Sequence, residues 1–169
     1  MRILVACVGN IFLGDDGFGS HVAAALSRRD IADGVRVEDY GIRSVHLTYE
    51  LMDGYDVLVL VDTVGRQTGP PGTLYVIEPD LAATSPGEGL PEALLDPHDL
   101  SPGGAMELAP LLGGSVARIL VVGVQPEYLE EGIGLSDAVA AAVEPAADLV
   151  VDVVSRELTR LASPAGGGG

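Results

Sequence analysis

Residues 9–19 read Gly-Asn-Ile-Phe-Leu-Gly-Asp-Asp-Gly-Phe-Gly, between an apolar run at residues 3–8 and an amphipathic segment that begins near Ser20. A strand, a glycine-rich turn and a helix in this order open many α/β domains in which the site lies above the sheet. The turn therefore predicts an α/β fold and is the first place to look for chemistry.

The turn differs from the known nucleotide-binding motifs. The dinucleotide fingerprint needs a third glycine between its outer two, but Ile11 stands between Gly9 and Gly14. The P-loop needs Lys and then Ser or Thr, where this chain has Asp15 and Asp16. Two adjacent carboxylates repel a phosphate and attract a cation. We interpret the turn as a metal-binding or proton-handling site.

The composition restricts the class of protein and its partners. A chain of 169 residues, 47 % of them hydrophobic, is long enough for one domain with its own core. A net charge of −16 repels nucleic acid and anionic lipid, so we expect neither as a partner. The charge also serves solubility, and it would suit a basic or metal-carrying partner.

The expected location is the cytoplasm. Cys7 is the single cysteine, which excludes an intrachain disulfide and favours a reducing compartment. The chain enters a strand at its start, without the features of a signal peptide, and no run reaches membrane-spanning length.

Strands and helices alternate along the rest of the chain. Apolar runs predict five strands, at residues 3–8, 35–37, 57–61, 73–77 and 117–124. Helical spacing predicts helices after the turn, at residues 44–51 and from Ser136 onward, where Pro145 should introduce a kink. Residues 101–110 are a weaker helix candidate. This alternation predicts a doubly wound sheet in three layers, followed by a flexible glycine-rich tail at residues 163–169.

Acidic residues and a histidine follow three of the predicted strands. Asp15 and Asp16 follow the first, Asp62 ends the third, and His98 lies in the long polar segment after the fourth. Ligands of open α/β sheets bind beyond the carboxyl ends of the strands, so we expect these residues at one rim. Carboxylates and an imidazole can bind a divalent transition metal and leave coordination positions open. Such a metal could polarise a carbonyl or lower the pKa of a bound water.

Each of these residues also has a purely structural interpretation. Asp15 is the better candidate for capping the first helix, and Asp62 can be an ordinary turn former. His98 can be a solvated loop residue, and spacing alone does not select it over His21 and His46 on predicted helices.

Motifs along almost the whole chain resemble those of one family. They are Met1-Arg2-Ile3-Leu4-Val5, Gly9-Asn10, Asp15-Asp16-Gly17-Phe18-Gly19, Asp39-Tyr40-Gly41, Val57-Leu58-Val59-Leu60-Val61-Asp62, Pro97-His98, Val122-Gly123-Val124-Gln125-Pro126-Glu127, Gly132-Ile133-Gly134-Leu135-Ser136 and Glu144-Pro145. In their order and spacing the chain resembles the hydrogenase maturation endopeptidases, peptidase family M52.

This resemblance implies a fold, a reaction and a set of ligands. The fold is an α/β three-layer sandwich, a twisted, mostly parallel five-stranded sheet flanked by helices on both faces, here a single peptidase domain at residues 1–162. Members of the family remove a C-terminal extension from a nickel-loaded hydrogenase large-subunit precursor. Nickel, supplied by the precursor, is bound in the family by residues that match Asp16, Asp62 and His98. The loop at residues 40–43 departs from the common family pattern, which bears on the choice of hydrogenase.

The main hypothesis is therefore a processing endopeptidase, a monomer or weak oligomer, whose partner is the hydrogenase large-subunit precursor. Two roles of nickel stay open, since it can activate water or only mark the substrate. A nickel or nickel-protein chaperone without peptidase activity would use the same ligands. A nucleotide-binding α/β domain is a third class, and the paired carboxylates disfavour it. A cysteine protease is disfavoured too, because Cys7 and His98 match no nucleophile motif.

Overall fold

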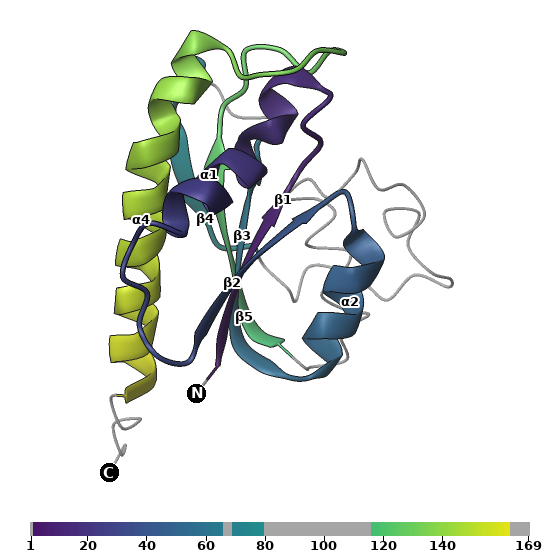
Figure 1. Ribbon diagram of the computed structural model, residues 1–169. Helices are drawn as coiled ribbons and strands as arrows, with labels where there is room; N and C mark the ends of the chain where they lie inside the picture. The colour runs from purple at the N-terminus through teal and green to yellow at the C-terminus, as the bar shows by residue number, and fades with distance from the viewer. Residues whose placement is uncertain (1, 66–68, 80–115, 163–169) are drawn as a thin grey trace.

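The computed structural model describes residues 2–65, 69–79 and 116–162 (Figure 1). His98, the helix candidate at residues 101–110 and the tail at residues 163–169 lie outside these ranges. The strands are β1 (Ile3–Val8), β2 (Val35–Gly41), β3 (Tyr55–Thr63), β4 (Leu74–Ile77) and β5 (Val116–Val124). The helical elements are the 3₁₀ turn η1 (Gly14–Gly17), α1 (Phe18–Leu26), α2 (Ser44–Met52) and α4 (Asp137–Ala162).

The strands form one five-stranded sheet in the order β2-β1-β3-β5-β4. Strands β2, β1, β3 and β5 pair in parallel with their neighbours, and β4 pairs antiparallel with β5. The prediction of a mostly parallel five-stranded sheet is confirmed. Strand β2 extends to Gly41, beyond the run predicted at residues 35–37, because polar residues of an edge strand can face solvent.

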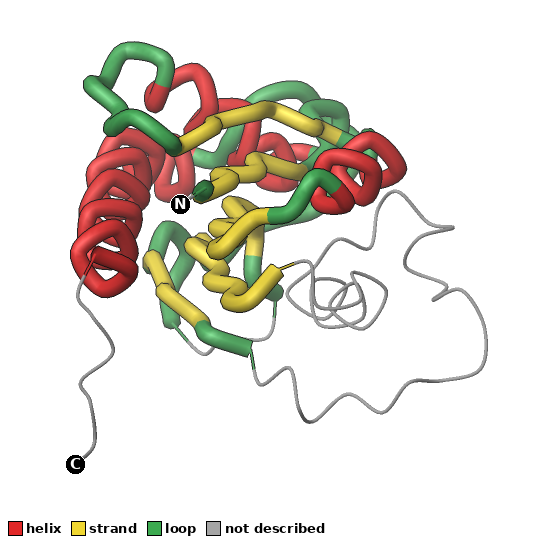
Figure 2. Tube along the Cα trace, turned by 90° about the horizontal axis from the view of Figure 1, so that it is seen from below, coloured by secondary structure: helices red, strands yellow, loops and turns green. Residues whose placement is uncertain are grey.

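Helices cover both faces of the sheet. The odd-numbered residues 3, 5 and 7 of β1 belong to a core that includes α1 and α4. The even-numbered residues 4, 6 and 8 belong to a second core that includes Leu47 and Leu51 of α2. Successive side chains of a strand point to opposite faces, so the sheet is the middle of three layers. Figures 1 and 2 show α2 on the side of the sheet opposite to α1 and α4. The predicted three-layer sandwich is confirmed.

The direction of β4 corrects the expectation that His98 follows a strand ending at the site. Strands β1, β3 and β5 run the same way, and their carboxyl ends meet at one rim. Strand β4 starts level with this rim, where Leu74 pairs with Val124, and runs away from it. Its carboxyl end therefore points to the opposite rim. A short apolar run does not specify strand direction, which is why the sequence did not reveal this.

Two glycines let the turn after β1 fold tightly over the sheet. Gly9 has a φ of 133°, and a Cβ there would lie 1.9 Å from the carbonyl oxygen of Asp16. A Cβ on Gly19 would lie 2.1 Å from the carbonyl oxygen of Val8, so α1 packs directly on the end of β1. Helix α1 begins at Phe18, slightly before the predicted start near Ser20. Both glycines thus fix the position of the turn at residues 9–19, with Asp15 and Asp16, relative to the ends of the strands.

Helix α4 continues through Pro145 over 26 residues. Among the residues that the structure describes, none of the helices has both the length and the apolar character needed to cross a membrane.

Candidate functional site

Asp16 and Asp62 lie next to each other at the carboxyl rim of the sheet. Asp16 comes from η1, and Asp62 is the next-to-last residue of β3. Thr63 links them: its hydroxyl donates to Asp16 Oδ1 at 3.4 Å, and its N–H donates to Asp62 Oδ1 at 2.7 Å. The structure therefore brings together two of the three predicted ligands. Thr63 was not among the residues predicted for the site, although its position directly after Asp62 at the end of a strand was a usable signal.

The side chain of Asp16 is fixed by the turn that carries it. The N–H of Asn10 donates to Asp16 Oδ2 at 2.8 Å, from the first part of the glycine-rich turn. The N–H of Gly9 donates to the carbonyl of Gly41 at 3.0 Å, which fastens the same turn to the end of β2. The carboxylate of Asp16 is thus held beside the ends of β1 and β3 by backbone groups of the same turn and by Thr63.

Asp16 and Asp62, which we call the acidic pair, repel each other when both carboxylates are ionised. Asp62 is only 5 % exposed. Burial, and secondly the charge of Asp16, raise the pKa of Asp62 well above its ordinary value of 3.8, while hydrogen bonds from Thr63 oppose this. A divalent cation between the carboxylates would favour the ionised form of both. The pair can therefore bind a metal ion or, without one, hold a proton.

Asp15 has a different role from its neighbour. It is fully buried, and its Oδ2 accepts hydrogen bonds from the N–H groups of Glu127 and Tyr128 at 2.8 and 3.2 Å. The N–H and hydroxyl of Ser136 donate to the same carboxylate at 2.7 and 3.0 Å. The alternative interpretation of Asp15 as the cap of the first helix is wrong, since no side-chain hydrogen bond caps the described N-terminus of α1. Asp15 instead holds the loop at residues 125–136 and the start of α4.

The two histidines that the structure describes do not complete a metal-binding cluster with Asp16 and Asp62. His21 on α1 and His46 on α2 are both exposed, and His21 lines a groove together with Glu144, to which neither Asp16 nor Asp62 contributes. Within residues 2–65, 69–79 and 116–162, no three His, Cys, Asp or Glu side chains form a metal-binding cluster. His98 lies outside those ranges, so its assignment as a ligand stays a prediction.

Cys7 is not a nucleophile of this site. It belongs to the core shared with α1 and α4, whereas alternation along β3 directs Asp62 to the other face. Burial, and secondly the charge of Asp39, raise the pKa of the Cys7 thiol well above its ordinary value. The thiol therefore stays protonated, and thiolate chemistry is disfavoured.

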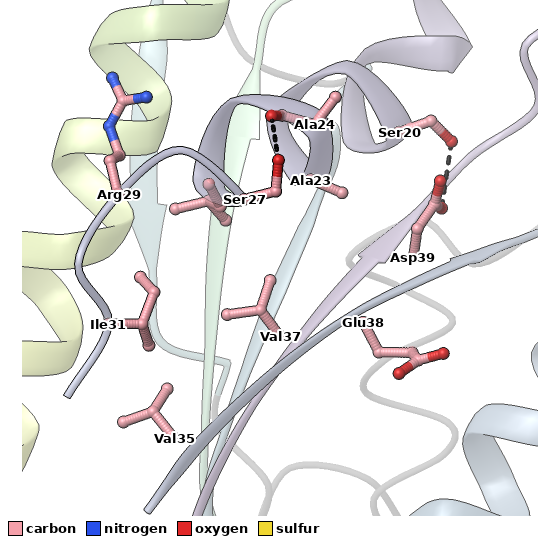
Figure 3. Close-up of a pocket in the computed structure, with 11 residues that line it drawn as sticks. Ser20, Ala23, Ala24, Ser27, Arg29, Ile31, Val35, Val37, Glu38 and Asp39 are labelled. Atoms are coloured by element: carbon pink, nitrogen blue, oxygen red, sulfur yellow. Dashed lines mark hydrogen bonds between the residues drawn. The ribbon is translucent and has the colours of Figure 1, made fainter. Parts of the chain in front are cut away.

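A groove of about 630 Å³ lies between α1 and the edge strand β2 (Figure 3). Its walls include Ala23 and Val37, and Ser20 donates to Asp39 at 3.1 Å at one end. Neither Asp16 nor Asp62 lines this groove. We therefore assign the candidate chemistry to the acidic pair, where charge and burial are unusual, rather than to this concave surface.

Asp62→Asn is expected to stabilise the metal-free protein at neutral pH by about 1 kcal/mol, a rise in Tm of about 2–4 °C. A carboxyl whose pKa is raised in the folded state stabilises that state while protonated. This contribution is complete below the ordinary pKa of 3.8 and is lost as the pH rises through the raised value. The amide does not titrate, so the advantage of the variant should grow with pH.

Thermal unfolding in the presence of a chelator at pH 4, 5, 6 and 7 measures this difference. Asp152→Asn removes an exposed carboxyl from α4 and is the matched control, with a small effect at every pH. A difference in Tm between Asp62→Asn and wild type that does not change with pH would contradict the raised pKa of Asp62.

Comparisons with known proteins identify the family. The model of the HycI hydrogenase maturation protease family matches residues 20–153. The chain is 32 % identical over 155 residues to the hydrogenase 2 maturation protease of Escherichia coli K12, covering 89 % of each chain. It is 30 % identical to the hydrogenase expression/formation protein HoxM of Azotobacter vinelandii, over 91 % of this chain and 72 % of that one.

Solved structures of similar proteins share the fold. The hydrogenase maturating endopeptidase HybD from E. coli superposes with a TM-score of 0.70 and 30 % identity, over 93 % of this chain and 94 % of that one. A hydrogenase 2 maturation peptidase from a Thaumarchaeota archaeon gives a TM-score of 0.68 and 31 % identity, over 92 % and 99 %. Since the family model covers most of the chain and these relatives match nearly end to end, the protein belongs to the hydrogenase maturation proteases and is a peptidase.

Proposed function

We propose that this protein removes a C-terminal extension from a nickel-loaded hydrogenase large-subunit precursor. The observation on which the proposal depends is the pairing of Asp16 with the buried Asp62, two carboxylates whose mutual repulsion a divalent cation would relieve. The names of the similar proteins, which are maturation proteases of hydrogenases, support the substrate class. In this reading nickel enters with the substrate.

Asp16, Asp62 and His98 would bind the nickel of the precursor. Asp16 contributes a fixed carboxylate, because Asn10 and Thr63 orient it. Asp62 can hold a proton until the ion arrives, because burial and the charge of Asp16 favour its neutral form. Nickel bound here would place the adjacent peptide bond at the strand ends, either to activate the attacking water or to mark the substrate.

The antiparallel direction of β4 does not prevent His98 from taking part. His98 follows the end of β4 by about 20 residues, which can span up to roughly 70 Å. Strand β3, with nine residues, is only about 30 Å long. The chain is thus long enough for His98 to reach either rim, and its role rests on the family motif Pro97-His98.

Incubation with a nickel-loaded precursor and mass spectrometry of the product tests this function. A fall in mass equal to a C-terminal peptide is expected, and the same precursor without nickel should stay intact. Formation of a stable complex with unchanged mass would favour the nickel chaperone instead. We place this reaction in the cytoplasm, because Cys7 is a free thiol and a reducing compartment keeps it reduced. The cleavage assay can therefore also be done in a cytoplasmic extract.

His98→Ala is expected to lower kcat/KM for the precursor by about 10²-fold or more, because the ion loses one of its ligands. His21→Ala and His46→Ala remove exposed imidazoles from α1 and α2 and should process like wild type. Normal processing by His98→Ala, measured as the rate of mass loss, would remove this residue from the ligand set.

A further inference from the structure

Large apolar side chains are exposed on two loops at the carboxyl rim. Phe12 is 61 % and Ile133 is 83 % exposed. Three further exposed side chains accompany them, and we call the five together the apolar rim: Ile11, Phe12, Tyr128, Leu129 and Ile133. Exposed apolar groups that gather in one place mark interaction sites far more often than single ones do. Figure 1 shows both loops at the top of the molecule, beyond the ends of β1 and β5.

The two loops are fastened to each other by their backbones. The N–H of Gly132 donates to the carbonyl of Phe12 at 2.9 Å, and the N–H of Gly14 donates to the carbonyl of Gly132 at 3.0 Å. The Tyr128 ring packs so closely on Gly14 that a Cβ there would lie 2.3 Å from it. The apolar rim is therefore one continuous and preorganised surface, which lowers the entropic cost of binding.

This surface continues directly into the candidate active site. Ile11 and Phe12 follow Asn10, whose N–H holds Asp16 at 2.8 Å. The opposite loop is held by Asp15, the neighbour of Asp16 in the same turn. A polypeptide bound at the acidic pair thus has the apolar rim as its adjoining surface.

The border of the apolar rim is acidic. Glu127, Glu130 and Glu131 are exposed on the same loop, and neither residues 9–19 nor residues 125–136 contain Lys or Arg. A complementary partner has an apolar centre with Lys or Arg at its edge. A second copy of this chain fits poorly, because the same glutamates would face one another across the interface.

We propose that the apolar rim docks the folded body of the nickel-bearing precursor, on a surface with exposed apolar side chains edged by basic residues. This inference rests on the proposed function. It adds a recognition surface outside the acidic pair, through which binding energy from the substrate body positions the scissile bond.

The test compares two double variants in steady-state cleavage of the nickel-loaded precursor. Phe12→Ser with Ile133→Ser removes the two most exposed apolar side chains of the rim and leaves the backbone hydrogen bonds of the loops in place. Tyr49→Ser with Met52→Ser is the matched control, because these side chains are 67 % and 70 % exposed on α2. We expect the rim variant to raise KM about tenfold or more with kcat at saturation little changed, and the control to match wild type.

Each other outcome has a defined meaning. If wild type cleaves the precursor and the rim variant has an unchanged KM, the docking surface is wrong and the proposed function stands. If wild type does not cleave, the proposed function fails and the docking inference falls with it. If light scattering shows that wild type is a dimer and that the rim variant is a monomer, then a second copy of the chain covers the surface. That result would also overturn the inference.

A charge swap supplies an independent readout. Glu130→Lys with Glu131→Lys should raise KM most at low ionic strength, because it places positive charges against the basic edge of the partner. An unchanged KM at low ionic strength would contradict the basic edge.

Discussion

Asp16→Asn is expected to lower kcat/KM for the nickel-loaded precursor by about 10³-fold or more while the protein stays folded. The amide has the shape of the carboxylate, and its oxygen can still accept the hydrogen bond from the N–H of Asn10. It lacks the negative charge that a divalent cation needs from its ligand. The loss should therefore appear in processing rather than in stability.

The measurement is the rate of mass loss of the precursor, with circular dichroism and thermal unfolding on the same samples. Asp152→Asn, on the exposed side of α4, is the control for loss of one carboxylate and should process normally. Asp16→Asn also removes the negative charge that is the second cause of the raised pKa of Asp62, so this pKa should fall. Processing by Asp16→Asn at the wild-type rate would mean that this carboxylate neither binds nickel nor orients the substrate.

The meeting of Asp16 and Asp62 could be predicted because it follows from local signals. Continuous apolar runs identified β1 and β3 as buried strands; Asp62 lies at the end of β3, and Asp16 lies in the glycine-rich turn that follows β1. Parallel strands carry such residues to one rim regardless of the number of residues between them. No precise knowledge of side-chain packing was needed, so the 45 intervening residues did not obscure the pair.

The direction of β4 and the role of Asp15 could not be predicted, for two physical reasons. Four apolar residues fit either strand direction, and only pairing with β5 decides between them. The hydrogen-bond partners of Asp15 lie 112 to 121 residues away, so nothing near it in the sequence indicates them. An aspartate beside the start of a helix is normally expected to cap that helix. Asp15 instead accepts hydrogen bonds from residues that are distant in the sequence.

Asp15→Ala should have the largest effect on stability, a loss of about 3 kcal/mol, or a fall in Tm of roughly 6–12 °C. The N–H and hydroxyl of Ser136 donate to Asp15 inside the protein, and both would lose their buried acceptor. The N–H groups of Glu127 and Tyr128 belong to exposed residues and can turn to water, so they add less. Chemical denaturation measures the loss.

Asp15→Asn distinguishes an acceptor role from simple packing, in contrast to the same change at Asp16. Three of the four hydrogen bonds at Asp15 reach Oδ2, and the N–H of Ser136 reaches Oδ1. The NH₂ of an amide would therefore oppose the N–H of Ser136, and Asn should destabilise the protein clearly, although less than Ala. Ser136→Ala combined with Asp15→Ala should be less than additive, because both changes remove the hydrogen bond from the Ser136 hydroxyl to Asp15. The loop at residues 125–136 carries three of the five residues of the apolar rim, so KM for the precursor should rise as well. If Asp15→Asn unfolds at the wild-type Tm, then the carboxylate is not what holds this loop to the acidic turn.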